Sequence, residues 1–198
     1  MRIISFVVVG VSSAACAGNF DVTDDIVTSE TWTADNVYNL TSQIYVRPGA
    51  TLTIQAGTKI VSTATANGSG ALCVANGGQL FVNGDSKAPV VMTSNLDDGT
   101  WRASCNEWGN LTICGDAYIG FDGVTNAGGF PGNTLSPSAS NEANMEGLVE
   151  EAGNPTLNNY GGGDDNYDAG SISYLSIRYG GRVVGLSNEL NGLSLGAL

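Results

Sequence analysis

The chain has 198 residues, of which 42% are hydrophobic, only 13% are charged and 28 are glycine. This composition suits one domain with a hydrophobic core and excludes a disordered chain. Nineteen acidic residues against seven basic ones give a net charge of −12, so partners with negative charge, nucleic acid and anionic lipid among them, are not expected.

The first 17 residues are typical of a secretory signal peptide. Arg2 supplies a basic start, residues 3–11 are apolar, and small residues lead to Ala17. We predict cleavage between Ala17 and Gly18. The mature protein is then secreted or held at the outer cell surface.

Two other interpretations of this N-terminal segment differ in how the chain meets a membrane. A transmembrane anchor is disfavoured because the apolar run is shorter than the roughly 20 residues that span a bilayer. Lipidation of Cys16, as in a bacterial lipoprotein, is the second alternative. No later segment is long and apolar enough to cross a membrane, so no transmembrane segment is predicted in the mature chain.

Residues 18–40 are polar and surround Trp32 with threonine and aspartate. A stacked repeat protein must cover its first open edge, so we expect a lead-in or cap here. We interpret Trp32 as an aromatic side chain that packs within this cap, with a sugar-stacking platform as the alternative.

The sequence between residues 44 and 94 repeats itself. The segment PGATLTI at 48–54 returns 28 positions later as NGGQLFV at 76–82, so Leu52 corresponds to Leu80. The apolar pair Ile60–Val61 returns as Val90–Val91, shifted two places further. Self-similarity at such a period indicates a stack of repeats.

Short strands with glycine-rich turns continue along the rest of the chain. LTI at 111–113 is interpreted as a third copy of the strand at Leu52 and Leu80, and residues 175–180 and 192–196 as two later rungs. Strands this short cannot each bury a face alone, whereas coiling pairs each one with the rungs above and below. The predicted fold is an all-β parallel β-helix, with a β-sandwich as the runner-up.

Residues 116–170 interrupt the pattern with a long insertion rich in Gly, Asn, Ser and Asp. Long loops carry function more often than scaffolds do. Near its end, Asp164, Asp165 and Asp168 lie within five residues on a glycine-rich turn. Carboxylates on a flexible turn are what Ca²⁺ prefers, so these three residues are a candidate calcium site, although the EF-hand spacing is absent. A solvated acidic turn is the alternative.

Three cysteines remain after the signal segment. Cys105 and Cys114, which flank Trp108, are the expected disulfide pair in an exported protein. Cys73 is expected to be a small buried hydrophobic residue. The chain has no histidine, so a zinc site is not expected.

Three segments resemble a known family: EWGNLTICGDAYI at 107–119, GSISYLSIRYGG at 170–181 and NELNGLSLG at 188–196. They are similar to secreted bacterial right-handed parallel β-helix repeat proteins, which are often named lipoproteins and have a pectin-lyase-like fold. The resemblance covers roughly residues 40–198 and implies that 41–198 form the rungs. It also implies further rungs beyond Leu198, so that this sequence is the N-terminal part of a longer protein.

Two functions are compatible with these features. A non-catalytic scaffold at the cell exterior that binds glycans or cell-envelope components accounts for the export signal, the repeats and the few catalytic residue types. The alternative is a calcium-assisted polysaccharide lyase, as the family resemblance implies, in which Arg178 or Arg182 would act beside the acidic turn at 164–168. Because a fold does not determine an activity, the scaffold is favoured.

Overall fold

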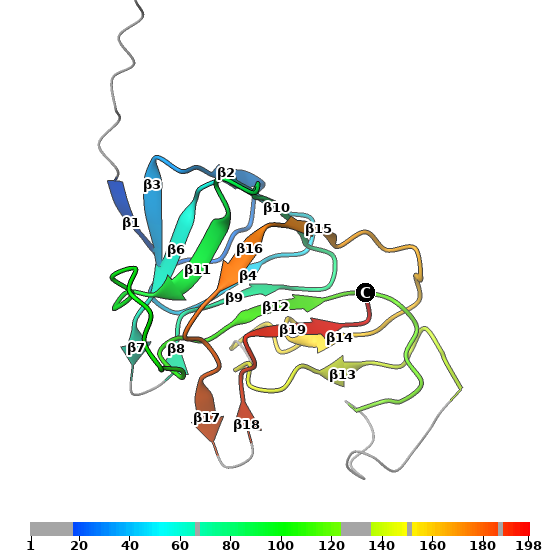
Figure 1. Ribbon diagram of the computed structural model, residues 1–198. Helices are drawn as coiled ribbons and strands as arrows, with labels where there is room; N and C mark the ends of the chain where they lie inside the picture. The colour runs from blue at the N-terminus through cyan, green and yellow to red at the C-terminus, as the bar shows by residue number, and fades with distance from the viewer. Residues whose placement is uncertain (1–17, 66–67, 124–135, 150–151, 186–187) are drawn as a thin grey trace, which may run out of the picture.

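The computed structural model describes residues 18–65, 68–123, 136–149, 152–185 and 188–198. These ranges contain strands and loops but no helix, and hence no helix that could cross a membrane. Most strands lie in three parallel sheets that wrap around a common core (Figure 1).

Each sheet is a stack of short strands taken from successive turns of the chain. Sheet A has the order β1 (Gly18–Val22), β3 (Asn36–Leu40), β6 (Lys59–Ser62), β11 (Val90–Ser94), β16 (Leu175–Ile177). Sheet B has the order β4 (Gln43–Val46), β9 (Ala71–Val74), β12 (Leu111–Cys114), β19 (Leu193–Gly196). Sheet C has the order β2 (Glu30–Trp32), β5 (Thr51–Gln55), β10 (Gln79–Asn83), β15 (Gly170–Ser173).

The chain visits sheets B, C and A in the same order on every turn. One complete coil is β4, β5, β6, the next is β9, β10, β11, and the third is β12, β15, β16. Neighbouring coils pair in parallel on all three faces. The predicted parallel β-helix is therefore confirmed, and the β-sandwich is wrong because its hairpins would pair the strands antiparallel.

The predicted repeat of residues 48–54 at 76–82 is confirmed in sheet C, where Leu80 pairs with Leu52. The prediction that LTI at 111–113 is a third copy of these sheet C strands is wrong. Leu111 pairs with Leu72 in sheet B and does not pair with Leu80. In sheet A, Ile60 lies opposite Met92 and not opposite Val90, so the offset between the two copies is larger than predicted.

Inward-facing side chains form vertical columns through the coils. Ile44, Leu72 and Leu111 are stacked in one column of sheet B, and all three are fully buried. In strands such as β5 and β10, apolar side chains that alternate with polar ones place one residue in two in the core. Burial of this continuous core is what holds the coils together, since no single coil could bury its own apolar face.

The segment 18–40, expected to be a lead-in or cap, forms strands that pair with the stack at its N-terminal end. β1 pairs with β3 in sheet A, and β2 pairs with β5 in sheet C. Trp32 is buried and stacks on Tyr38 with ring centroids 4.5 Å apart, as predicted for a packing aromatic. Phe20 of β1 continues this stack at 6.1 Å from Tyr38.

The insertion packs on the outside of sheet B. Its strands β13 (Ala143–Asn144) and β14 (Asn159–Tyr160) form a short antiparallel pair. Leu148 and Leu157 join Leu190 and the outward-facing side chains of sheet B in a second apolar cluster. The strands β9 and β12 of sheet B are consequently buried on both faces, and the cluster includes Cys73, which confirms its predicted burial.

Two further hairpins follow sheet A strands. β7 (Ala64–Thr65) pairs with β8 (Gly68–Ser69), and β17 (Val183–Gly185) pairs with β18 (Asn188–Glu189). Each hairpin leaves sheet A and returns to sheet B, so both extend the same corner of the β-helix.

The predicted disulfide is not formed, because Cys73, Cys105 and Cys114 are all free thiols. Cys105 is exposed in the loop before Trp108, whereas Cys114 is buried at the end of β12 with its Sγ 3.9 Å from the Asn158 carbonyl oxygen. Trp108 lies between them in the sequence and points into the inner core. Burial raises the pKa of the Cys114 thiol to about 12, so this thiol is unreactive at neutral pH.

Candidate functional site

The acidic turn predicted to bind calcium uses its carboxylates to accept hydrogen bonds from backbone N–H groups, two within the turn and one from Tyr118. Asp164 accepts from the Asn166 N–H at 2.9 Å, and Asp168 from the Gly170 N–H at 2.9 Å. Asp165 accepts from the Tyr118 N–H at 3.0 Å. Nowhere in the described ranges do three acidic, histidine or cysteine side chains converge as metal ligands. The structure thus does not assemble the predicted calcium site.

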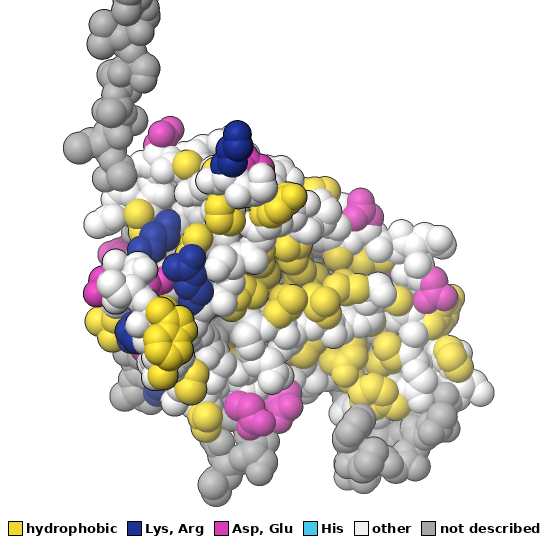
Figure 2. Space-filling view, in the orientation of Figure 1, with side chains coloured by type: hydrophobic (Ala, Val, Ile, Leu, Met, Phe, Trp, Pro, Cys, Tyr) yellow, Lys and Arg dark blue, Asp and Glu magenta, His cyan; other side chains and the backbone are white. Residues whose placement is uncertain are grey.

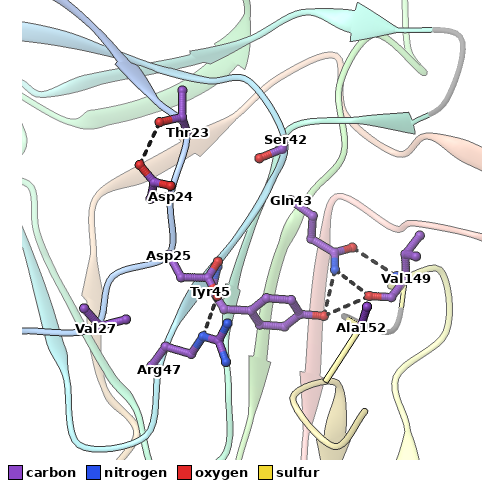
Figure 3. A pocket seen from close by; sticks show the side chains of 10 residues that line it. All are labelled: Thr23, Asp24, Asp25, Val27, Ser42, Gln43, Tyr45, Arg47, Val149 and Ala152. Carbon is purple, nitrogen blue, oxygen red and sulfur yellow. Dashed lines mark hydrogen bonds and ion pairs between the residues drawn. The ribbon is translucent and has the colours of Figure 1, made fainter. Parts of the chain in front are cut away.

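A cleft of about 700 Å³ lies between the start of the β-helix and the insertion (Figure 3). Its walls come from the loop after β1, from β4 with the residues on either side of it, and from Val149 and Ala152 of the insertion. The ten lining residues are Thr23, Asp24, Asp25, Val27, Ser42, Gln43, Tyr45, Arg47, Val149 and Ala152.

The polar side chains of this cleft bind one another. Asp25 forms an ion pair with Arg47 and also accepts from the Tyr45 N–H at 2.8 Å. The Gln43 amide donates to the Val149 carbonyl at 2.8 Å and accepts from the Val149 N–H at 3.1 Å. Figure 3 shows these groups pointing toward one another across the cleft. The arrangement fastens the insertion to β4, which is a structural role.

The outer face of sheet A presents a different arrangement, in which basic and aromatic side chains gather. We call Lys59, Asp97, Trp101, Arg102 and Arg178 the sheet A platform. They come from β6, from the loop after β11 and from the residue after β16. Trp101 is 86% exposed. Figure 2 shows Lys and Arg side chains beside hydrophobic ones in this region.

Asp97 is the centre of the platform. Its buried carboxylate accepts from the Thr93 hydroxyl at 2.7 Å, and its Oδ2 lies 3.4 Å from Nη1 of Arg178. Nζ of Lys59 donates to the Asp97 carbonyl at 3.4 Å. The Thr93 hydroxyl, the Gly99 N–H and the two cations lower the pKa of Asp97, although burial opposes them. Asp97 therefore stays ionised and holds both cations at the surface.

A second charged pair fixes the loop that carries Trp101. Arg102 makes a bidentate pair with Glu107, with N–O distances of 2.5 and 2.7 Å, and its guanidinium lies 4.3 Å from the ring centre of Tyr179. The Tyr179 hydroxyl donates to the Thr100 carbonyl at 3.3 Å. Both neighbours of Trp101 are thus held to the body of the protein, while its indole faces solvent.

The Glu107 pair predicts a pH-dependent stability. The hydrogen bonds from Arg102 lower the pKa of Glu107 from 4.5 to about 2. Because the pKa in the folded state is below the unfolded value, the ionised carboxylate stabilises the fold above about pH 4.5, and this contribution is lost as the pH falls toward 2. Glu107→Gln should lower the free energy of unfolding at pH 7 by about 1–2 kcal/mol after allowance for solvent screening. Urea titrations of both proteins at several pH values measure this, and an unchanged difference between pH 7 and pH 3 would contradict it.

A family model supports the assignment of the fold. The model, described as a pectate-lyase like beta helix domain, matches residues 24–198. The chain belongs to this pectate-lyase-like β-helix family. Comparison with curated proteins finds no match to this β-helix protein, and comparison with solved structures finds none either.

The structure revises the choice of functional residues in this pectate-lyase-like β-helix protein. Arg178 was expected to act beside the turn at 164–168, but its partners are Asp97 and Ser176. Arg182 lies in the segment before β17, where its carbonyl accepts from the Leu190 N–H at 2.8 Å. Sequence reasoning missed Asp97 and Trp101. The available signal was the turn motif DDGTW at 97–101, which follows the predicted strand around Val90–Val91. The motif ends in a tryptophan, a large apolar residue in an otherwise polar turn.

Proposed function

We propose that this protein is a non-catalytic β-helix scaffold of the cell exterior that binds polysaccharide through the sheet A platform. The observation that carries the proposal is Trp101, which is 86% exposed on a loop held by the Arg102–Glu107 pair. The proposed location outside the cell depends on the export signal expected at residues 1–17. These residues lie outside those that the structure describes.

An exposed tryptophan on a fixed loop suits a ligand with flat apolar faces and polar edges. Exposed apolar groups beside charged ones mark interaction sites, and tryptophan combines a large contact area with few rotamers to fix. Sugar rings present C–H faces to an indole and hydroxyl groups to side-chain donors. Arg178 and Lys59 offer such donors around Asp97, which begins the loop that carries Trp101, and three of the seven basic residues of the chain lie in the platform.

A calcium-assisted lyase is the second candidate, and the Asp97–Arg178 pair is the observation that favours it. A lyase of this kind needs a cationic group and a carboxylate on one face of neighbouring coils. Arg178 and Asp97 meet that requirement on sheet A, with their charged groups 3.4 Å apart. The carboxylate is already committed to Thr93 and Arg178, which leaves fewer oxygens for a metal and favours binding over cleavage.

Trp101→Ala is expected to weaken polysaccharide binding by about tenfold, because tryptophan side chains at the centre of a contact commonly contribute more than 1 kcal/mol. Affinity electrophoresis through gels that contain neutral or uronate-bearing polysaccharides, followed by calorimetry on the retained ones, measures this. Tyr174→Ala is the matched control, since Tyr174 is an exposed aromatic residue outside the platform.

Two results would count against the proposal. Equal retention of the wild-type protein and Trp101→Ala would remove the indole from the site. A calcium-dependent rise in ultraviolet absorbance on incubation with a uronate polysaccharide would show cleavage and establish the lyase instead. Loss of that rise in Arg178→Lys, with binding retained, would assign the chemistry to the guanidinium.

A further inference from the structure

The cleft between the start of the β-helix and the insertion has the size of a ligand site. Its volume of about 700 Å³ lies within the range of small-molecule sites. Figure 3 shows Thr23, Asp24 and Val27 on one side of it and Val149 and Ala152 on the other. The cleft shares no residue with the sheet A platform, so a ligand bound here is distinct from the polysaccharide proposed for that platform.

The walls of the cleft are fixed before any ligand enters. Gln43 bonds to the carbonyl and the N–H of Val149, at 2.8 and 3.1 Å, and its amide also donates to the Tyr45 hydroxyl at 2.7 Å. Asp25 holds Arg47 and the Tyr45 N–H, and the side chains of this ion pair are only 14% and 19% exposed. A ligand therefore does not have to order these groups, which lowers the entropic cost of binding.

The hydrogen-bond donors of these walls are directed at acceptors of the cleft itself. The Thr23 hydroxyl donates to the Asp24 carboxylate at 2.9 Å, and Gln43 and Arg47 make the bonds described above. A carboxylate offers about four lone-pair sites, so Asp24 can accept further bonds from a ligand. The cleft consequently favours a ligand that donates hydrogen bonds over one that accepts them.

The charge of the lining favours a cationic donor. The lining contains two carboxylates, Asp24 and Asp25, and one cation, Arg47, so its charges sum to −1 (−2 + 1). Arg47 is paired with Asp25, whereas Asp24 is exposed to solvent. An ammonium group carries a positive charge and three donors but no acceptor. Its bond to a carboxylate is also stronger than a bond between neutral groups.

We propose that this cleft binds a compound that carries a primary ammonium group on a short carbon chain or on a sugar ring. The ammonium group donates to the Asp24 carboxylate. The carbon skeleton contacts Val27 and Val149, which line the cleft and are 67% and 65% exposed. A free polyamine and the glucosamine unit of a polysaccharide both offer this chemistry.

Nuclear magnetic resonance titrations with cadaverine and with a glucosamine tetramer test the proposal and distinguish these two sources. The matched ligands are pentanediol and the N-acetylated tetramer, which keep the carbon skeleton but lack the positive charge. At least one ammonium ligand should bind and shift the amide signals of Asp24, Asp25 and Gln43. Its uncharged counterpart should bind about fivefold more weakly, the factor that an exposed ion pair contributes at most.

Asp24→Asn should weaken binding of the ammonium ligand by about the same fivefold factor. Asp35→Asn is the matched control, because it removes the same charge from an exposed aspartate outside the cleft and should bind like the wild type. Ser42→Phe adds a ring to the lining without a change of charge and should also weaken binding. All three residues are exposed, so the melting temperatures should stay close to the wild-type value.

Three results would overturn the proposal: no binding of either ammonium ligand, equal affinities for the charged and uncharged ligands, or an affinity that survives Asp24→Asn. Binding of cadaverine alone would identify a free amine as the ligand, and binding of the tetramer would identify an amino sugar. Trp101→Ala should leave ammonium binding unchanged, and Asp24→Asn should leave retention in polysaccharide gels unchanged. The cleft and the sheet A platform can therefore fail independently.

Discussion

Replacing Leu80 with alanine is expected to lower the free energy of unfolding by about 3–4 kcal/mol. Leu80 is fully buried in the column of sheet C, with Leu52 below it. The position above it is Gly170, which has no side chain to move into the space. The cavity left by the substitution therefore stays open, and both the lost burial and the cavity add to the cost.

Urea unfolding followed by circular dichroism measures this loss. Leu96→Ala removes the same atoms from a side chain that is mostly exposed, so it should change the free energy of unfolding by less than about 0.5 kcal/mol. If the two variants were equally stable, the column of sheet C would not be a packed core.

The alternation of apolar and polar residues was enough to predict the strands β5 and β10 of sheet C. In β5 and β10 the inward residues Leu52, Ile54, Leu80 and Val82 are buried, while the threonine or phenylalanine between them is only partly buried. Because one face of such a strand meets the core and the other meets solvent, its sequence shows the period of two directly.

The assignment of strands to faces could not be predicted in the same way. Leu52–Ile54 and Leu111–Ile113 both read LTI, yet they lie in sheets C and B. Strands of sheets A, B and C all need apolar residues at their inward-facing positions. Only the lengths of the turns between strands could tell which sheet a strand belongs to, and those lengths vary from coil to coil. β9 reads ALCV without alternation because the insertion covers its outer face.

The candidate site was missed for a related reason. Lys59, Asp97 and Arg178 come from three separate parts of the chain, and only the stacking of β6, β11 and β16 brings them to one face. The acidic turn at 164–168 was selected because its carboxylates are close in sequence. In the structure Asp164 and Asp168 each accept from the backbone N–H two residues on, which is the common role of aspartate in turns, and Asp165 accepts from the distant Tyr118 N–H.

Gly170→Ala is expected to destabilise the last coil by about 3 kcal/mol or more, because two separate costs combine at this residue. Its φ is +109°, a conformation that alanine adopts with strain of order 1–3 kcal/mol. A Cβ would also lie 2.0 Å from the Leu80 carbonyl oxygen, which is backbone and cannot rotate away. β15 would have to separate from β10 to relieve the contact.

Gly49→Ala separates the two costs. Gly49 has a φ of +83°, but a Cβ there would meet nothing within 4 Å, so only the backbone strain of about 1 kcal/mol applies. Urea unfolding of both variants gives the difference, and hydrogen exchange at β15 and β16 locates it. A larger loss in Gly170→Ala, concentrated in these two strands, is the expected result. Equal losses would mean that β15 moves away from β10 at little cost, and the last coil would then be held mainly by β16 and β19.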